Sequence, residues 1–158
     1  MIEVYPNLYV GTESDCFLDD RDDWAVVHAC KFPCHQKAVG YRGNLSHTHS
    51  NYLVLEQGTH LFLNLIDPDT PLFKPLLFDS ALSFINRYFP THKVLIHCNK
   101  GNSRAPSLAL LYLSKCIQVI NSERYATAAK DFRTKFPSYQ PGRGIQTYLT
   151  KHWIEIKG

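Results

Sequence analysis

The chain has 158 residues, of which 44% are hydrophobic and 20% are charged. This length and balance predict one globular domain, residues 1–158, with its own core, and they exclude a disordered chain. The formal net charge of +3 suits an anionic substrate but is too small to indicate a nucleic-acid partner.

Two further features indicate where the chain works. The first residues, MIEVYPNLYVG, lack the basic start and apolar core of a signal peptide, and no apolar run reaches the length of a membrane span. The five cysteines, an odd number, are typical of reduced thiols. We therefore expect a cytoplasmic monomer without membrane partners.

The first third of the chain predicts a hairpin and a buried strand. Residues 2–11 form two short apolar pieces around Pro6, and residues 24–29 are apolar except for His28. The acidic stretch between them can hold a short helix capped by Thr12 or Ser14.

Residues 31–58 are the least regular part of the sequence. They are rich in Pro, Gly, Asn and Ser, and we expect a long irregular insertion. Its side chains Tyr41, Arg42 and Tyr52 are candidates for a wall that selects the substrate.

The remainder alternates strands and helices. Strands are predicted at residues 61–66 and 94–96, and helices at 76–88, 107–116, 125–136 and 145–156. This order predicts an α/β fold, with a central, mostly parallel mixed sheet of about four to five strands flanked by helices.

The most informative stretch is the polar loop of residues 97–104, between the strand at 94–96 and the following helix. Backbone N–H groups of a tight loop before a helix N-terminus favour an anion, and the same field favours a thiolate at Cys98. Arg104 offers a planar fork of donors to two phosphate oxygens, and Gly101 permits the positive φ that such a loop needs. A thiolate, oxyanion donors and an arginine are what nucleophilic attack on phosphorus requires.

A cysteine and an arginine five residues apart are a weak signal alone, because the spacing also arises by chance. The strand before the loop, the glycine inside it and the helix after it supply the structural context that the chemistry needs.

Together these residues resemble the cysteine-based protein tyrosine phosphatases, and the chain looks closest to their dual-specificity branch. The loop HCNKGNSR at residues 97–104 fits the phosphate-loop signature of that family position by position. The segment LYVG at 8–11 is similar to a Leu-Tyr-Leu-Gly segment near the start of many dual-specificity domains. The turn PGRGI at 141–145 resembles the Pro-Asn-x-Gly-Phe turn before the last helix.

The resemblance implies a two-step reaction without metal or cofactor. Cys98 would attack phosphorus and form a cysteinyl-phosphate, which water then hydrolyses. The residue equivalent to His97 helps to set the loop shape and the thiolate. The implied substrate is a phosphoprotein or phosphopeptide, with phosphotyrosine and phosphoserine or phosphothreonine as the candidate groups. It would be held by Asn99, Lys100, Gly101, Asn102, Ser103 and Arg104.

The resemblance also requires an aspartic acid as general acid, on a loop after a strand and about thirty residues before the cysteine. Asp67 and Asp69 both qualify. Asp67 directly follows a predicted strand, which fixes its position better, whereas Asp69 precedes Thr70 as in some dual-specificity members. Both remain candidates, with preference for Asp67.

Two positions depart from the family pattern. Many members carry Ser or Thr directly after the arginine, where the hydroxyl assists breakdown of the intermediate, and this chain has Ala105. We therefore expect slow hydrolysis of the intermediate. Gly142 stands where the usual asparagine of the last turn would be.

Residues 28–60 also permit a zinc site, because they contain several soft ligands: His28, Cys30, Cys34, His35, His47, His49 and His60. Their spacings match no common zinc pattern, so we expect no metal. A further hypothesis is that Cys30 or Cys34 forms a protective disulfide with Cys98 on oxidation.

Two other functions stay open. A phosphatase fold without turnover would act as a phosphate-recognising binding module. A phosphatase could also act on a phosphoinositide or on the 5′ phosphate of RNA, although those branches usually place more basic residues around the loop than Lys100 and Arg143 provide.

Overall fold

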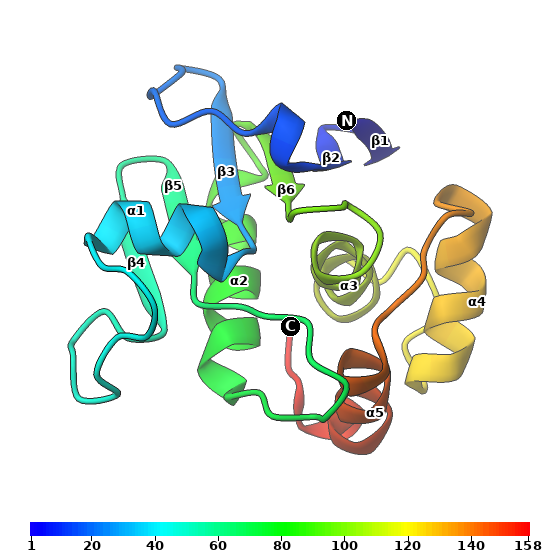
Figure 1. The fold of residues 1–158 in the computed structure, drawn as a ribbon. Coiled ribbons are helices and arrows are strands. Elements are labelled where there is room, and N and C mark those ends of the chain that lie inside the picture. Colours follow the sequence, from blue (N-terminus) through cyan, green and yellow to red (C-terminus); the bar gives the residue numbers. More distant parts are fainter.

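The computed structural model describes the whole chain, Met1–Gly158, as one α/β unit. A sheet in the order β1-β2-β6-β3-β5-β4 forms its centre (Figure 1). Its strands are β1 (Ile2–Tyr5), β2 (Leu8–Gly11), β3 (Trp24–His28), β4 (Val54–Gln57), β5 (His60–Leu63) and β6 (Lys93–His97).

The sheet is mixed, as expected from the sequence. The four inner strands run parallel, and the edge strands β1 and β4 pair antiparallel with β2 and β5. The six strands exceed the four to five predicted. Residues 2–11 form a true hairpin with two strands, and β4 had not been recognised because its residues are mostly half-buried or exposed.

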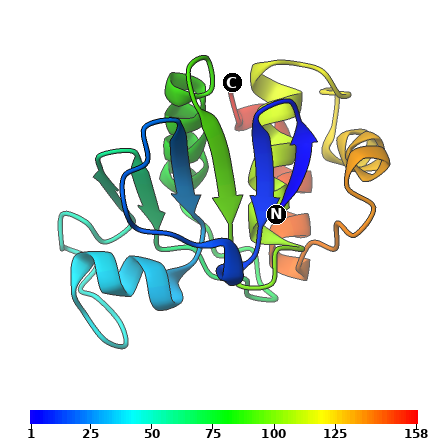
Figure 2. The same cartoon turned by 90° about the horizontal axis from the view of Figure 1, so that it is seen from above.

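One face of the sheet carries the main hydrophobic core under four helices (Figure 2). These are α2 (Pro75–Tyr88), α3 (Arg104–Leu111), α4 (Tyr125–Lys135) and α5 (Arg143–His152). The short π-helical turn η3 (Tyr112–Cys116) extends α3, and the 3-10 turn η4 (Trp153–Glu155) follows α5. The strands contribute alternate residues such as Val27 and Ile96 to this core, as their period of two requires.

The opposite face of the sheet is also buried. The segment between β2 and β3, which begins with the 3-10 turn η1 (Glu13–Asp15), crosses it in Figure 2. On this side Phe62 packs in a small cluster with Cys30 and Cys34. Both faces of the inner strands are therefore covered, as is usual for parallel strands.

Residues 31–58 are more regular than the sequence indicated. They begin with the kinked turn η2 (Lys31–His35), in which Phe32 has an extended backbone, continue into α1 (Gln36–Val39), and end in β4. Pro33 does not interrupt the helical segment, because it lies near its start, where proline is tolerated. Only the middle of the segment is irregular, so the predicted lack of regular structure was wrong at both ends of the segment.

None of the helices combines the length and the apolar character needed to cross a bilayer.

Candidate active site

The loop of residues 97–104 follows β6 directly, at the carboxyl end of a central strand, and leads into α3. Open α/β sheets usually bind their ligands at this end. Cys98 is only 2% exposed and lies at the base of the loop. Its Sγ accepts a hydrogen bond from the backbone N–H of Ala105, 3.4 Å away. The first turn of the helix therefore points a donor at this sulfur, an arrangement that favours negative charge there.

The loop is fixed on both sides by backbone contacts. The N–H of Glu13 donates to the carbonyl of Asn99 at 3.2 Å, and the N–H of Gln140 donates to that of Asn102 at 2.8 Å. Gly101 has φ +75°, and a β-carbon there would lie 2.9 Å from the carbonyl oxygen of Gly11. The predicted need for glycine at position 101 is confirmed, both by backbone conformation and by this close approach.

Arg104 is aligned by two hydrogen bonds. Its Nη1 donates to the carbonyl of Leu65 at 3.0 Å, and its Nη2 donates to Oδ1 of Asn99 at 2.6 Å. Its Nε is buried and has no hydrogen-bond partner. A buried guanidinium nitrogen without a partner is costly, and an anion in the loop would supply one.

Asn99 links the arginine to two segments that the sequence did not associate with the site. Its Nδ2 donates to Oε2 of Glu13 at 3.0 Å and to the carbonyl of Phe32 at 2.9 Å. Phe32 is 69% exposed beside the loop. No sequence pattern marked Glu13 or Phe32, because both contacts join segments distant in the chain.

A cavity of about 240 Å³ opens over the loop. Its lining consists of Asp67, Cys98, Asn99, Lys100, Asn102, Ser103 and Arg104. Asp67 is thus brought to the loop, and its carboxylate packs against Gly142. Asp69 is exposed and is not part of this lining. Gly101 shapes the loop from its inner side without lining the cavity.

The two serines near Ala105 are engaged elsewhere. Ser103 Oγ accepts a hydrogen bond from the N–H of Gly142 at 2.8 Å, and Ser107 Oγ lies 2.8 Å from the hydroxyl of Tyr139. Burial raises the pKa of Tyr139 well above its usual value, so this phenol stays protonated. Neither serine takes the position of the hydroxyl that Ala105 lacks.

The proposed substrate wall from residues 31–58 is not assembled as predicted. The hydroxyl of Tyr41 is hydrogen-bonded to Nδ1 of His35 at 2.6 Å. Tyr52 lines a separate cavity with Lys31 and Asn44, and neither Arg42 nor the two tyrosines line the cavity over Cys98. Of this segment, Phe32 is the residue that borders the loop.

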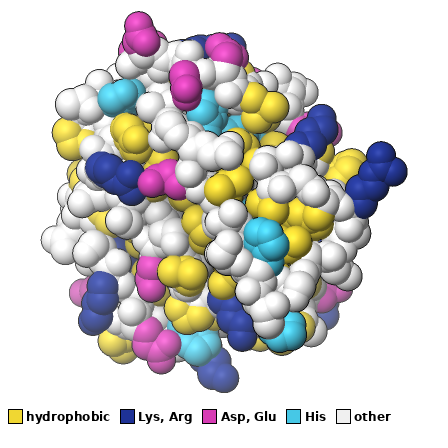
Figure 3. All heavy atoms as spheres, turned by 90° about the vertical axis from the view of Figure 1, so that its left-hand side faces the viewer, with side chains coloured by type: hydrophobic (Ala, Val, Ile, Leu, Met, Phe, Trp, Pro, Cys, Tyr) yellow, Lys and Arg dark blue, Asp and Glu magenta, His cyan; other side chains and the backbone are white.

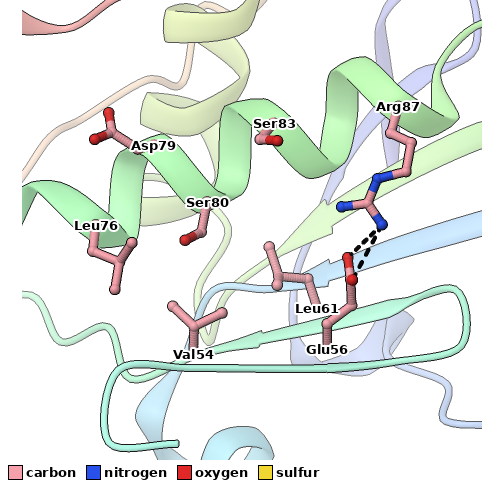
Figure 4. Close-up of a pocket in the computed structure, with 8 residues that line it drawn as sticks. All are labelled: Val54, Glu56, Leu61, Leu76, Asp79, Ser80, Ser83 and Arg87. Atoms are coloured by element: carbon pink, nitrogen blue, oxygen red, sulfur yellow. Dashed lines mark hydrogen bonds and ion pairs between the residues drawn. The ribbon is translucent and has the colours of Figure 1, made fainter. Parts of the chain in front are cut away.

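A larger groove, about 340 Å³, lies between α2 and β4 (Figure 4). Its Arg87 pairs with Glu56 at 2.9 Å, and this carboxylate raises the pKa of the guanidinium. The groove contains no cysteine, its serines Ser80 and Ser83 have no histidine in the lining to activate them, and its arginine already has a partner. It is therefore a weaker candidate than the smaller cavity over Cys98.

No protein-family model matches the sequence. Among solved structures, DUSP15 aligns with a TM-score of 0.65 at 17% identity, over 97% of this chain and 86% of that protein. The human tyrosine phosphatase-like serine/threonine/tyrosine-interacting protein aligns with a TM-score of 0.63 at 18% identity, over 97% and 95% of the two chains. PTPMT1 in complex with PI(5)P aligns with a TM-score of 0.54 at 13% identity, over 85% and 78%. The chain therefore has the fold of the dual-specificity phosphatases.

Proposed function

We propose that the protein is a cysteine-dependent phosphatase that hydrolyses phosphate monoesters. The observation that carries the proposal is the convergence of Cys98, Arg104 and Asp67 on one cavity, with Arg104 Nε buried beside it without a partner. The helix that begins at Arg104 contributes a field that favours the anion.

In the first step, the Sγ of Cys98 attacks phosphorus, and the bond from phosphorus to the leaving oxygen breaks. The proton of the Asp67 carboxyl passes to that oxygen, so the product leaves as an alcohol or phenol. Arg104 and the loop N–H groups bind the equatorial oxygens, where charge is held in the transition state.

In the second step, water attacks phosphorus, its proton passes to the Asp67 carboxylate, and the sulfur–phosphorus bond breaks. Inorganic phosphate and the Cys98 thiolate are regenerated, and the Asp67 carboxyl is ready for another cycle. Asp67 thus gives one proton to the leaving oxygen in the first step and takes one from water in the second.

For the substrate we propose phosphoproteins or phosphopeptides, with phosphotyrosine as the first choice and phosphoserine and phosphothreonine next. Two features support this choice. The loop carries one lysine, Lys100. Phe32, whose backbone carbonyl accepts a hydrogen bond from the loop residue Asn99, is an exposed aromatic residue that is available to contact a phenyl group.

Phosphate release from a panel of phosphopeptides tests the proposal, with a phosphoinositide and a 5′-phosphorylated RNA as comparison substrates. Wild type is expected to release phosphate from phosphotyrosine peptides, and Cys98→Ser to release none while keeping the same circular dichroism spectrum. Equal release by the two proteins would reject Cys98 as nucleophile. Turnover of the phosphoinositide or RNA alone would reject the protein substrate.

A further inference from the structure

Directly beneath the loop, on the sheet face opposite the main core, two cysteines and two histidines point their ligand atoms at one spot. They are Cys16, His28, Cys34 and His97, and all four ligand atoms lie within 4.8 Å of one another. They come from the segment after η1, the end of β3, the turn η2 and the end of β6. The cluster lies outside the cavity over Cys98, and the proposed reaction does not use it.

The distances within the cluster are close to those of a tetrahedral site. Cys16 Sγ lies 4.0 Å from Cys34 Sγ and 3.6 Å from His28 Nδ1, and Cys34 Sγ lies 4.0 Å from His97 Nε2. Zinc bonds of about 2.3 Å to sulfur and 2.0 Å to nitrogen place neighbouring ligand atoms roughly 3.3–3.8 Å apart. The His28 Nδ1 to His97 Nε2 distance of 2.7 Å is shorter, so these two rings must move apart by about 0.6 Å when an ion binds between them.

A hydrogen-bond relay orients His28 as a ligand. The carbonyl of Asp19 can only accept, so His60 Nε2, 3.1 Å away, carries the hydrogen. His60 Nδ1 then accepts from His28 Nε2 at 2.9 Å, which leaves the lone pair of His28 Nδ1 directed into the cluster. Ligating histidines usually donate their second N–H to such an outer partner.

His97 brings the second imidazole to the cluster through its Nε2 atom. It is fully buried, and its Nδ1 has no hydrogen-bond partner. Its side-chain polar contacts therefore all lie on the Nε2 side, toward His28 and Cys34. His28 on β3 is paired with His97 on β6, so both rings lie on the same face of the sheet.

We propose that Cys16, His28, Cys34 and His97 bind one zinc ion. Two thiolates and two neutral imidazoles form a charge-balanced S2N2 set for Zn²⁺, and tetrahedral sites of this composition favour zinc. All four positions are filled by protein, which is typical of structural and not catalytic sites. Cys16 is half-buried and gives the ion a route from solvent.

The site differs from the zinc set that the sequence suggested. Of that set, His28 and Cys34 belong to the cluster. His60 is the hydrogen-bond partner of His28, and His35 is hydrogen-bonded to Tyr41. His47 and His49 are exposed. Figure 3 shows histidines among hydrophobic and charged side chains of both signs on one face, without a single-sign patch. The bound zinc would fix η2 to the sheet and hold His97, the residue before Cys98.

The test measures metal content and does not depend on phosphatase activity. The full chain is reduced, stripped of metal, equilibrated with Zn²⁺ and passed over a gel-filtration column before its metal is quantified. We expect one zinc per wild-type chain, one per Cys116→Ser chain, and loss of that zinc in Cys16→Ser and Cys34→Ser. Cys116 lies outside the cluster and serves as the matched control.

Cobalt keeps the proposal testable if the variants fold poorly. Wild type loaded with Co²⁺ should show the strong visible bands of a tetrahedral ion and a thiolate-to-cobalt charge-transfer band. His60→Phe should weaken zinc binding roughly 10- to 100-fold, because it removes the outer partner of His28. Absence of both zinc and the cobalt bands in reduced wild type would overturn the proposal. Retention of zinc by Cys16→Ser and Cys34→Ser would also overturn it. The same holds if Cys16 and Cys34 form a disulfide and the protein binds no zinc after that disulfide is reduced.

Discussion

The carboxylate of Asp67 occupies the space that a β-carbon on residue 142 would need. Gly142 has an ordinary φ of −61°, so its lack of a side chain matters for space and not for backbone conformation. The same glycine donates its N–H to Ser103 Oγ in the loop. Gly142 stands where the turn that this segment resembles usually has asparagine. Its lack of a side chain leaves the space in which Asp67 reaches the cavity over Cys98.

Replacing Gly142 with alanine should displace Asp67 without disturbing Cys98. We expect kcat for alkyl phosphates to fall by about tenfold or more, with the 10²–10⁴-fold contribution of a general acid as the upper limit. The measurement is a double-mutant cycle with Asp67→Asn. Gly142→Ala should cause little further loss in the Asp67→Asn background. Additive losses would show that Gly142 acts independently of Asp67.

Substitution of Asp67 and of Asp69 should affect kcat differently, and the difference should depend on the leaving group of the substrate. Asp67→Asn is expected to lower kcat by about 10²-fold or more for phosphoserine peptides and far less for an aryl phosphate with an acidic phenol, which needs little protonation. Asp69→Asn is the matched control, because that carboxylate does not line the cavity, and it should remain near wild type with both substrates. The reverse ranking would assign the acid to Asp69.

The absence of a hydroxyl at position 105 predicts slow breakdown of the intermediate. Rapid-mixing kinetics with an aryl phosphate should show a burst of phenol close to the enzyme concentration, followed by slower turnover. Ala105→Ser should raise the steady-state rate and shrink the burst. Strictly linear release by wild type would contradict this account of the second step.

Asn99 should act as a positioning residue for Arg104. Asn99→Ala removes the acceptor 2.6 Å from Nη2 and should weaken inhibition by vanadate about tenfold, the order of one charged hydrogen bond. The pH profile of kcat should keep its shape, because no titrating group is lost. Asn44→Ala, at an exposed asparagine outside the cavity, is the control and should leave inhibition unchanged.

Gly101→Ala should destabilise the protein more than Gly43→Ala. Both glycines have positive φ, so both variants carry strain of about 1–3 kcal/mol, but only a β-carbon at position 101 meets another backbone atom. Thermal unfolding should give a clearly lower Tm for Gly101→Ala, at about 2–4 °C per kcal/mol for a chain of this size. Equal Tm values would show that the contact with Gly11 relaxes at no cost.

The strand–loop–helix unit around Cys98 could be predicted because all of its signals are local. The apolar run, the glycine and the helix start lie within about twenty consecutive residues, and each has a direct conformational reason. The central sheet followed from the same kind of pattern. The choice between Asp67 and Asp69, by contrast, could not be made from the sequence of the loop after β5. Asp67 lines the cavity and packs against Gly142, a residue far along the chain, and no local pattern encodes that contact.

What the sequence missed depends on contacts between distant segments. Cys16 and His97 meet only because the segment after β2 crosses the sheet above the end of β6, and no spacing rule encodes that crossing. Phe32 reaches the loop through a backbone carbonyl, which carries no sequence signature. Edge strand β4 was missed because it is short and poorly buried.

Covalent capture of the intermediate tests the central claim most directly. Wild type is mixed with a phosphotyrosine peptide, quenched in acid within the burst, and digested for mass spectrometry. The account predicts one phosphoryl group on the peptide that contains Cys98, and none in Cys98→Ser. A wild-type protein that releases phosphate without a phosphoryl group on Cys98, or a Cys98→Ser protein that still turns over, would contradict it.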